Sequence, residues 1–94
     1  MILERTEIEV SDRKAGEFAR VVMSDMAPLL RLCKGVRSVR VMRGRETPTK
    51  FLFLVEWESL DAHHSAQKLP EHRKFRSMFA PYGISGKMEH FKDL

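Results

Sequence analysis

Histidine, tryptophan and arginine residues whose side chains could do chemistry gather between positions 57 and 76 of the chain. Histidine titrates near neutral pH, so His63 or His64 could take the proton of a phenolic hydroxyl. The ring of Trp57 is large enough to stack on an aromatic ligand, and its indole N–H can donate one hydrogen bond. The candidate catalytic residues are therefore His63, His64 and Trp57.

Each of these residues also has a purely structural interpretation. Trp57 could anchor the sheet to a helix, His63 or His64 could be a surface histidine, and His72 could pack beside Phe75. No metal site is expected, because the histidines lack the two-ligands-on-one-face spacing of a helical zinc site and no cysteine or paired carboxylate joins them. No Gly-rich phosphate loop, nucleotide-binding fingerprint or Ser-His-Asp set is present, so the sequence predicts no cofactor.

The segment 50–57 is apolar on both faces of a strand, which predicts that it lies at the centre of a sheet. A period of two divides the apolar residues between the faces, with Phe51, Phe53, Val55 and Trp57 on one and Leu52 and Leu54 on the other. A strand with one wet face alternates apolar and polar residues, so both faces here need cover. Helices are expected on one face and a second subunit on the other.

The first strand is predicted over residues 2–10. Period two gives it a core-facing side with Ile2, Thr6, Ile8 and Val10, and a charged side with Arg5, Glu7 and Glu9. If the charged side met the space beside Phe53 and Trp57, that space would be a pocket with a polar wall, which a purely structural core avoids.

Helical patterns occupy three segments. The first runs from residue 11 or 12 to about Cys33, and Pro28 should kink it or end its first part because proline removes a backbone donor and clashes with the preceding turn. Its apolar stripe consists of Phe18, Val22, Met26, Leu29 and Cys33. Ser59 is expected to cap a short second helix and Pro70 to open a third.

With further strands at 36–46 and 84–91, the order is strand, helix, strand, strand, helix pair, strand. This order predicts a ferredoxin-like α+β fold, βαββαβ, in one domain spanning residues 1–94. Its four antiparallel strands would be backed by helices on one face only, with the first and third strands in the middle. The uncovered apolar face therefore predicts a homodimer.

The composition favours a soluble cytoplasmic protein without a membrane partner, because no run approaches the roughly 18 apolar residues of a membrane span. The single cysteine, Cys33, is expected to be a buried helical thiol. The net charge of +4 is spread along the chain, so no nucleic-acid partner is expected, and the arginines at 37, 40, 43 and 45 should protect a strand edge or stay solvated. RNA-recognition modules share this strand–helix order, but the first strand here offers no aromatic residue and Glu56 occupies their final aromatic position.

The segment Val55-Glu56-Trp57-Glu58-Ser59, followed by a histidine-bearing helix and Pro70-Glu71-His72-Arg73, resembles the antibiotic biosynthesis monooxygenase family over nearly the whole chain. The resemblance implies a dimeric α+β barrel, in which two ferredoxin-like sheets pack face to face and each subunit keeps a pocket between its sheet and its helices. The family includes cofactor-independent oxygenases of polycyclic quinols, haem-degrading enzymes and members with no known substrate.

The resemblance also implies positions for pocket residues. Trp57 is similar to the tryptophan that lines the pocket of the quinol-oxidising members, His63 stands where they have a polar aromatic residue, and their arginine falls near Arg73 or Arg76. Their asparagine falls at Phe53, which cannot donate a hydrogen bond to a substrate carbonyl. The substrate-binding candidates are Phe53, Trp57, His72, Arg73 and Arg76.

The activity implied by the resemblance is oxidation of a phenol or quinol by molecular oxygen without metal or flavin. A deprotonated polycyclic phenol can itself pass an electron to oxygen, so the protein need only bind the ring, hold the anion and exclude water. Haem degradation is not expected, because Ala66 stands at the second tryptophan of that branch and Arg76 near its haem-ligating histidine. The alternative is a non-catalytic, stress-related or structural dimeric barrel that binds a small hydrophobic molecule.

Overall fold

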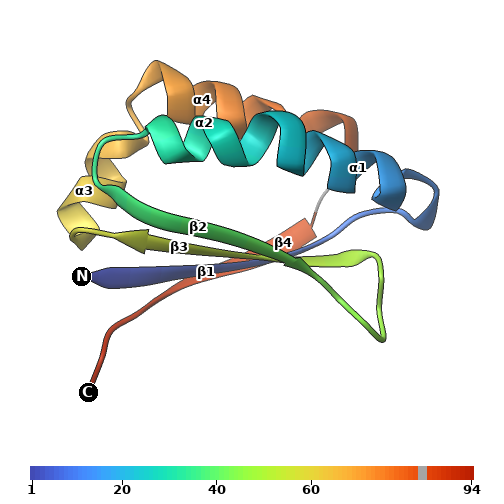
Figure 1. Cartoon of the computed structure of the whole chain (residues 1–94), viewed down its shortest axis with the longest axis horizontal. Helices are drawn as coiled ribbons and strands as arrows, with labels where there is room; N and C mark the ends of the chain where they lie inside the picture. Colours follow the sequence, from blue (N-terminus) through green and yellow to red (C-terminus); the bar gives the residue numbers. More distant parts are fainter. Residues whose placement is uncertain (83–84) are drawn as a thin grey trace.

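The computed structural model describes residues 1–82 and 85–94, which form one antiparallel sheet with helices on one side (Figure 1). The strands are β1 (Ile2–Glu9), β2 (Val36–Arg43), β3 (Lys50–Trp57) and β4 (Ser85–Phe91). The helices are α1 (Ala15–Val21), α2 (Ala27–Leu32), α3 (Leu60–Ala66) and α4 (Pro70–Ser77), with short 3-10 turns at Asp12–Lys14 and Ala80–Tyr82. Position 84, where the sequence predicts the last strand to begin, lies outside the described residues.

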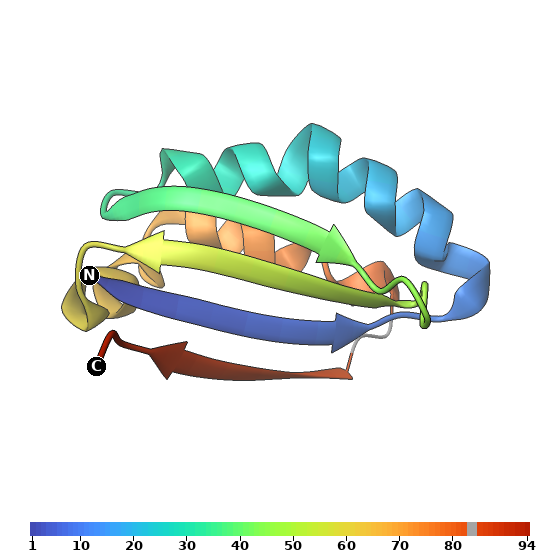
Figure 2. The same ribbon diagram turned by 60° about the horizontal axis from the view of Figure 1, so that its bottom comes forward.

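The sheet has the strand order β2-β3-β1-β4, so β1 and β3 lie in the middle as predicted (Figure 2). Every neighbouring pair is antiparallel, and the fold is ferredoxin-like α+β. In the register between the two central strands, Glu4 lies opposite Val55 and Thr6 opposite Phe53. Because opposite residues point to the same face, the even-numbered residues of β1 share the helix-covered face with the odd-numbered residues of β3.

The helix-covered face of β3 forms the centre of the core. Its buried side chains are Phe51, Phe53, Val55 and Trp57. The ring of Phe18 from α1 meets that of Phe51 edge to face, with centroids 4.8 Å apart. Such aromatic pairs add about 0.5–1.5 kcal/mol to the free energy gained by burying their apolar surface.

The other face of the sheet is not covered by helices. Leu52 and Leu54 lie on it, half-buried, opposite Glu7 and Arg5 of β1. The hypothesis that Arg5, Glu7 and Glu9 line a pocket beside Phe53 and Trp57 is therefore wrong, because the register places those charges on the opposite side of the sheet.

The first helical segment is interrupted just before its proline, where α1 passes into a π-helical turn at Val22–Met26. Pro28 then stands in the first turn of α2. Because proline has no N–H and clashes with the preceding turn, a wider turn at this point relieves the conflict. The wider turn adds one residue to the spacing, so Leu30 is buried where a regular stripe predicts Leu29, which is only partly buried.

Two loops set the ends of β2. Gly35 has a φ of 94°, and a Cβ there would lie 2.7 Å from the Cβ of Ala62, so only glycine fits this turn. The strand ends at Arg43 rather than at position 46, and the Arg43 guanidinium donates to the carbonyl oxygen of Pro48 at 2.6 Å.

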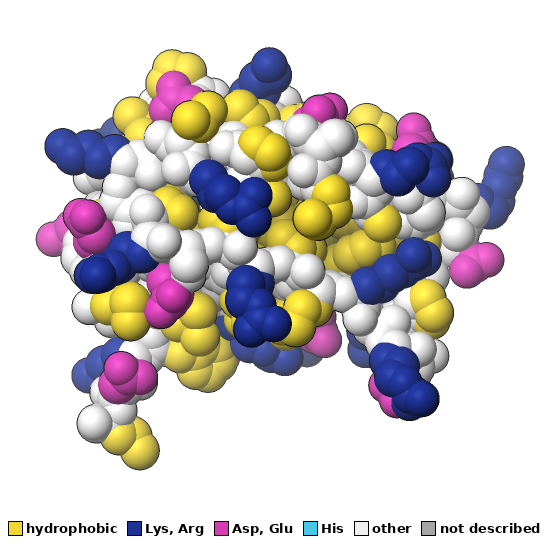
Figure 3. All heavy atoms as spheres, in the orientation of Figure 1, with side chains coloured by type: hydrophobic (Ala, Val, Ile, Leu, Met, Phe, Trp, Pro, Cys, Tyr) yellow, Lys and Arg dark blue, Asp and Glu magenta, His cyan; other side chains and the backbone are white. Residues whose placement is uncertain are grey.

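On the face drawn in Figure 3, Lys and Arg side chains are interspersed with apolar and acidic ones.

The two short helices after β3 turn histidines towards the core. Ser59 caps α3 by accepting a hydrogen bond from the Ala62 N–H at 3.0 Å, and Pro70 opens α4, both as predicted. The residues that face inward are His63 and Ala66 on α3 and His72 and Phe75 on α4. These helices, together with β1 and β3, position the candidate site.

Candidate functional site

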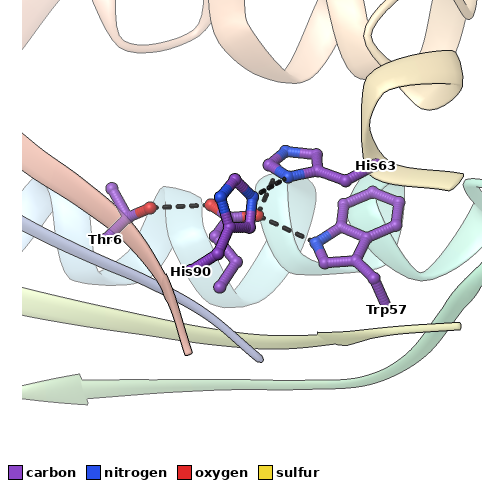
Figure 4. Close-up of polar contacts among 5 residues, drawn as sticks. Thr6, Trp57, His63 and His90 are labelled. Carbon is purple, nitrogen blue, oxygen red and sulfur yellow. Dashed lines mark hydrogen bonds and ion pairs between the residues drawn. The ribbon is translucent and has the colours of Figure 1, made fainter. Parts of the chain in front are cut away.

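The carboxylate of Glu4 on β1 lies at the centre of a polar network between the sheet and α3 (Figure 4). The indole N–H of Trp57 donates to Glu4 Oε1 at 2.9 Å, and the hydroxyl of Thr6 donates to Oε2 at 2.7 Å. Nε2 of His63 lies 3.3 Å from the same Oε1. The Glu4 side chain is 13% exposed, and these three partners compensate for its removal from water.

His63 connects Glu4 to His90 on β4. Its ring is 3% exposed and stacks on Trp57, with 4.5 Å between centroids and 15° between planes. Nδ1 of His63 lies 2.7 Å from Nε2 of His90. A carboxylate can only accept, so these contacts assign the hydrogen of His63 to Nε2 and make Nδ1 the acceptor from His90. Burial lowers the pKa of His63 in spite of the nearby Glu4, in keeping with a neutral ring.

A cavity of about 200 Å³ opens beside this network, between the sheet and helices α3 and α4. Its apolar walls are Phe53, Phe75, Phe79 and Met88. Its polar lining consists of Glu4, Thr6, His63, Gln67, His72 and Arg76. Because an apolar cavity of about 150 Å³ can hold benzene, this one suits an aromatic ligand of one or two rings.

His72 lines the cavity and has one buried ring nitrogen without a partner in the described part of the chain. The residue is 5% exposed, and its Nδ1 has no hydrogen-bond partner among the described residues. Burial, helped by the charge of Arg76 and by His63, lowers the pKa of His72 to about 4, so the ring is neutral at pH 7. A buried polar atom without a partner costs about 1–3 kcal/mol.

Arg76 and Gln67 lie at the open end of the cavity. The exposed Arg76 donates from Nη2 to the backbone oxygen of Gln67 at 2.8 Å. Met88, in the same lining, is 49% exposed. A guanidinium group carries several N–H donors in a fixed plane, so Arg76 can also bind an acceptor group on a ligand.

The structure gathers some of the sequence-predicted site residues around the cavity and leaves others outside it. Phe53, His63, His72 and Arg76 line it. Trp57 is 0% exposed, stacks behind His63 and is not part of the lining. His64 and Arg73 are exposed and also lie outside the lining, because each follows an inward-facing histidine by one position and helical spacing turns it away. The catalytic and binding roles of these residues stay predictions.

Three members of the network, Glu4, Thr6 and His90, are missing from the sequence-based candidates. Glu4 carries a signal that could have found it, because it falls between Ile2 and Thr6 on the core-facing side of its strand, where a carboxylate requires partners. His90 carries none, since most of β4 is exposed. Only the register of the sheet, which places His90 opposite Glu4, brings it to the site.

Within residues 1–82 and 85–94, no group of three or more His, Cys, Asp or Glu side chains is arranged to hold a metal ion. Cys33 is buried, as predicted, and burial raises the pKa of its thiol. No helix in the described part of the chain is long and apolar enough to cross a membrane.

Several solved structures share this fold over nearly the whole chain. A protein from Deinococcus radiodurans assigned to the antibiotic biosynthesis monooxygenases matches with a TM-score of 0.84 and 18% identity, covering 100% of this chain and 93% of that one. Another from Bordetella bronchiseptica matches with a TM-score of 0.86 and 21% identity, covering 99% and 96%. SnoaB, a cofactor-independent oxygenase from Streptomyces nogalater, matches with a TM-score of 0.84 and 15% identity, covering 99% and 92%.

At these identities the structural likeness concerns the fold, and the family follows from sequence. A comparison with curated protein sequences finds no significant match. The family profile described as antibiotic biosynthesis monooxygenase matches residues 1–78, which extend from β1 to α4 and include Glu4, His63 and His72. The chain therefore belongs to the antibiotic biosynthesis monooxygenase family.

Proposed function

We propose that the protein is a monooxygenase that oxidises a phenol or quinol with molecular oxygen, the substrate itself supplying the electrons. Membership of the family and the fold shared with the oxygenase SnoaB support this proposal. The observation that carries it is the cavity with aromatic walls that His72, a residue with a buried and unpaired Nδ1, helps to line. A phenol fits such a site because its ring packs against aromatic side chains while its hydroxyl meets the imidazole of His72.

The proposed reaction begins with transfer of the phenolic proton to the imidazole ring of His72. The anion that forms beside His72 raises the low pKa of this residue, because a neighbouring negative charge favours the protonated ring. The phenolate then passes one electron to oxygen, and the substrate radical and superoxide combine to form a C–O bond. Protonated His72 returns its proton to the distal peroxide oxygen. Loss of the ring C–H proton and of hydroxide, together one water, leaves a quinone.

Oxygen consumption tests this function. With one- and two-ring hydroquinones and naphthols the native chain should consume oxygen faster than buffer does, and His72→Gln should lower the rate at least about tenfold, a typical contribution of a general base. His64→Gln is the comparison, because it makes the same change at an exposed histidine outside the cavity lining. No uptake by the native chain, or equal loss in both variants, would contradict the proposal.

A second candidate function is binding of a small hydrophobic molecule without turnover. It is favoured by the internal pairing of the polar groups: the Trp57 N–H and both ring nitrogens of His63 already have partners within the protein. Tight binding of naphthols with no oxygen consumption would identify this function.

We further propose that two chains associate through the uncovered face of the sheet. This face carries the half-buried Leu52 and Leu54, with exposed Met42 and Phe91 on its edge strands. An apolar strip of this kind is expected to pair with a second copy of itself about a two-fold axis. Light scattering should give the mass of a dimer at micromolar concentration, whereas a monodisperse monomer would contradict the proposal.

A further inference from the structure

The hydrogen-bond donors beside the buried end of the cavity are directed at one carboxylate. Trp57 donates its indole N–H and Thr6 its hydroxyl to Glu4, and Nε2 of His63 lies 3.3 Å from Oε1 of the same carboxylate. Each of these atoms carries a single hydrogen, so none is left for a ligand. A ligand that reaches this end therefore meets no free donor from these three residues.

Acceptors remain at the same end. A carboxylate offers about four acceptor sites, and Glu4 accepts two hydrogen bonds and has Nε2 of His63 at 3.3 Å, while the hydroxyl oxygen of Thr6 keeps its lone pairs. Nδ1 of His72 has no partner among the described residues. A hydroxyl suits both Glu4 and His72, because it can donate to the carboxylate and can pair with the imidazole nitrogen in either tautomer. A carbonyl or ether oxygen cannot donate to Glu4.

Donors lie at the opposite, solvent-facing end. The guanidinium of Arg76 is exposed there and holds the backbone oxygen of Gln67 with one of its N–H groups, and the amide of Gln67 is half-buried. The cavity thus changes its hydrogen-bonding character along its length, from accepting at Glu4 and His72 to donating at Arg76.

We propose that this cavity selects an aromatic molecule of one or two rings that carries a hydroxyl at the inner end and a carboxylate or carbonyl at the outer end. The inference deepens the proposed function and rests on it for the reaction, because it names the substrate class of the same site. The hydroxyl donates to Glu4 or His72, the ring packs against Phe53 and Phe75, and the outer oxygen binds Arg76. Oxidation at the inner end replaces the hydroxyl with a carbonyl, which cannot donate, so the product binds more weakly than the substrate and leaves.

Binding of three naphthalene probes under nitrogen, measured by titration calorimetry, tests the selection. The native chain should bind 6-hydroxy-2-naphthoate about 10-fold to 100-fold more tightly than 6-methoxy-2-naphthoate, because the ether donates no hydrogen to Glu4 or His72. It should also bind 6-hydroxy-2-naphthoate several-fold more tightly than 2-naphthol, which has no group for Arg76. Without oxygen there is no turnover, so the result does not depend on the proposed oxidation.

Matched variants test the residues. Glu4→Gln adds an amide N–H₂ that can donate to an ether oxygen, so the preference for the hydroxyl over the methoxy probe should fall at least about fivefold. Glu89→Gln makes the same carboxylate-to-amide change on the opposite face of the sheet, where Glu89 lies opposite Arg5, and should keep the preference. Arg76→Gln should remove the advantage of the carboxylate probe over 2-naphthol.

Equal affinities of the native chain for the hydroxyl and methoxy probes, or no binding of any probe, would overturn the inference whatever the variants do. The inference would also fail if the Arg76→Gln variant still preferred 6-hydroxy-2-naphthoate over 2-naphthol by the same factor as the native chain. If the expected binding preferences were found but no phenol caused oxygen uptake, the proposed selection would be supported and only the proposed oxidation would be contradicted.

Discussion

Acidification from pH 7 to pH 5 is expected to destabilise the fold through His72. Burial lowers the pKa of this histidine from 6.5 to about 4. Between pH 6.5 and pH 4 the unfolded chain binds a proton at this histidine that the folded chain does not. The stability that depends on the neutral ring is therefore fully present above pH 6.5, the pKa in the unfolded chain, and is lost as the pH falls towards 4, the pKa in the folded chain. Between pH 7 and pH 5 this linkage amounts to about 2 kcal/mol of unfolding free energy.

Urea denaturation at the two pH values measures this loss, and His72→Gln isolates it from the other titrating groups. On acidification, the unfolding free energy of the native chain should fall by about 2 kcal/mol more than that of His72→Gln. For a domain of this size, this corresponds to a difference of about 2 M in the shift of the urea midpoint. His64→Gln, at a histidine that is exposed in the folded chain, is the matched control and should lose as much as the native chain. The reasoning is refuted if the native chain and His72→Gln lose equal stability.

Three further predictions concern stability and assembly. Gly35→Ala should lower the unfolding free energy by about 2 kcal/mol or more in thermal denaturation, because the φ of Gly35 is 94° and a Cβ there would be blocked. Gly16→Ala is the control: it lies in open space on a helix and should raise the unfolding free energy by about 0.5–1 kcal/mol. Equal effects of the two substitutions would contradict this prediction. Trp57→Phe removes the N–H bound to Glu4 and should cost about 1–3 kcal/mol in urea, and no cost would mean that the bond contributes nothing. Leu54→Lys on the uncovered sheet face should yield a monomer by light scattering with an unchanged circular dichroism spectrum, and a persistent dimer would exclude that face as the interface.

The strands and their order could be predicted because the signal is local. Apolar residues on both faces of 50–57 require a central strand wherever the rest of the chain goes, and this was confirmed. The shift from Leu29 to Leu30 could not be predicted in the same way. Pro28 indicates a conflict in the helix, but a kink, a break and a π turn all relieve it, and packing against the sheet decides between them.

The cavity depends on contacts that a periodicity cannot supply. His63 and His64 are adjacent, and only the docking of α3 on the sheet determines which of the two rings is buried. Glu4 and His90 come from opposite ends of the chain and meet His63 through the pairing of β1 with β3 and β4. Phe53, His72 and Arg76 all line the cavity, but which of the chemically capable residues keeps an unpaired atom is a property of the assembled network.

The last strand has a consequence for how ligand preference can diverge within the family. β4 is an edge strand, exposed at six of its seven residues, yet its register directs Met88 and His90 to the helix-covered side of the sheet. Substitutions of the exposed Met88 remove little buried surface and so cost the fold little, whereas substitutions of His90 leave Nδ1 of the buried His63 without its partner. New ligand preferences can therefore arise at the outer wall of the cavity by neutral drift, without compensating changes in the core. A mutagenesis library at Met88, with His90 kept, is accordingly an economical starting point for retargeting this protein.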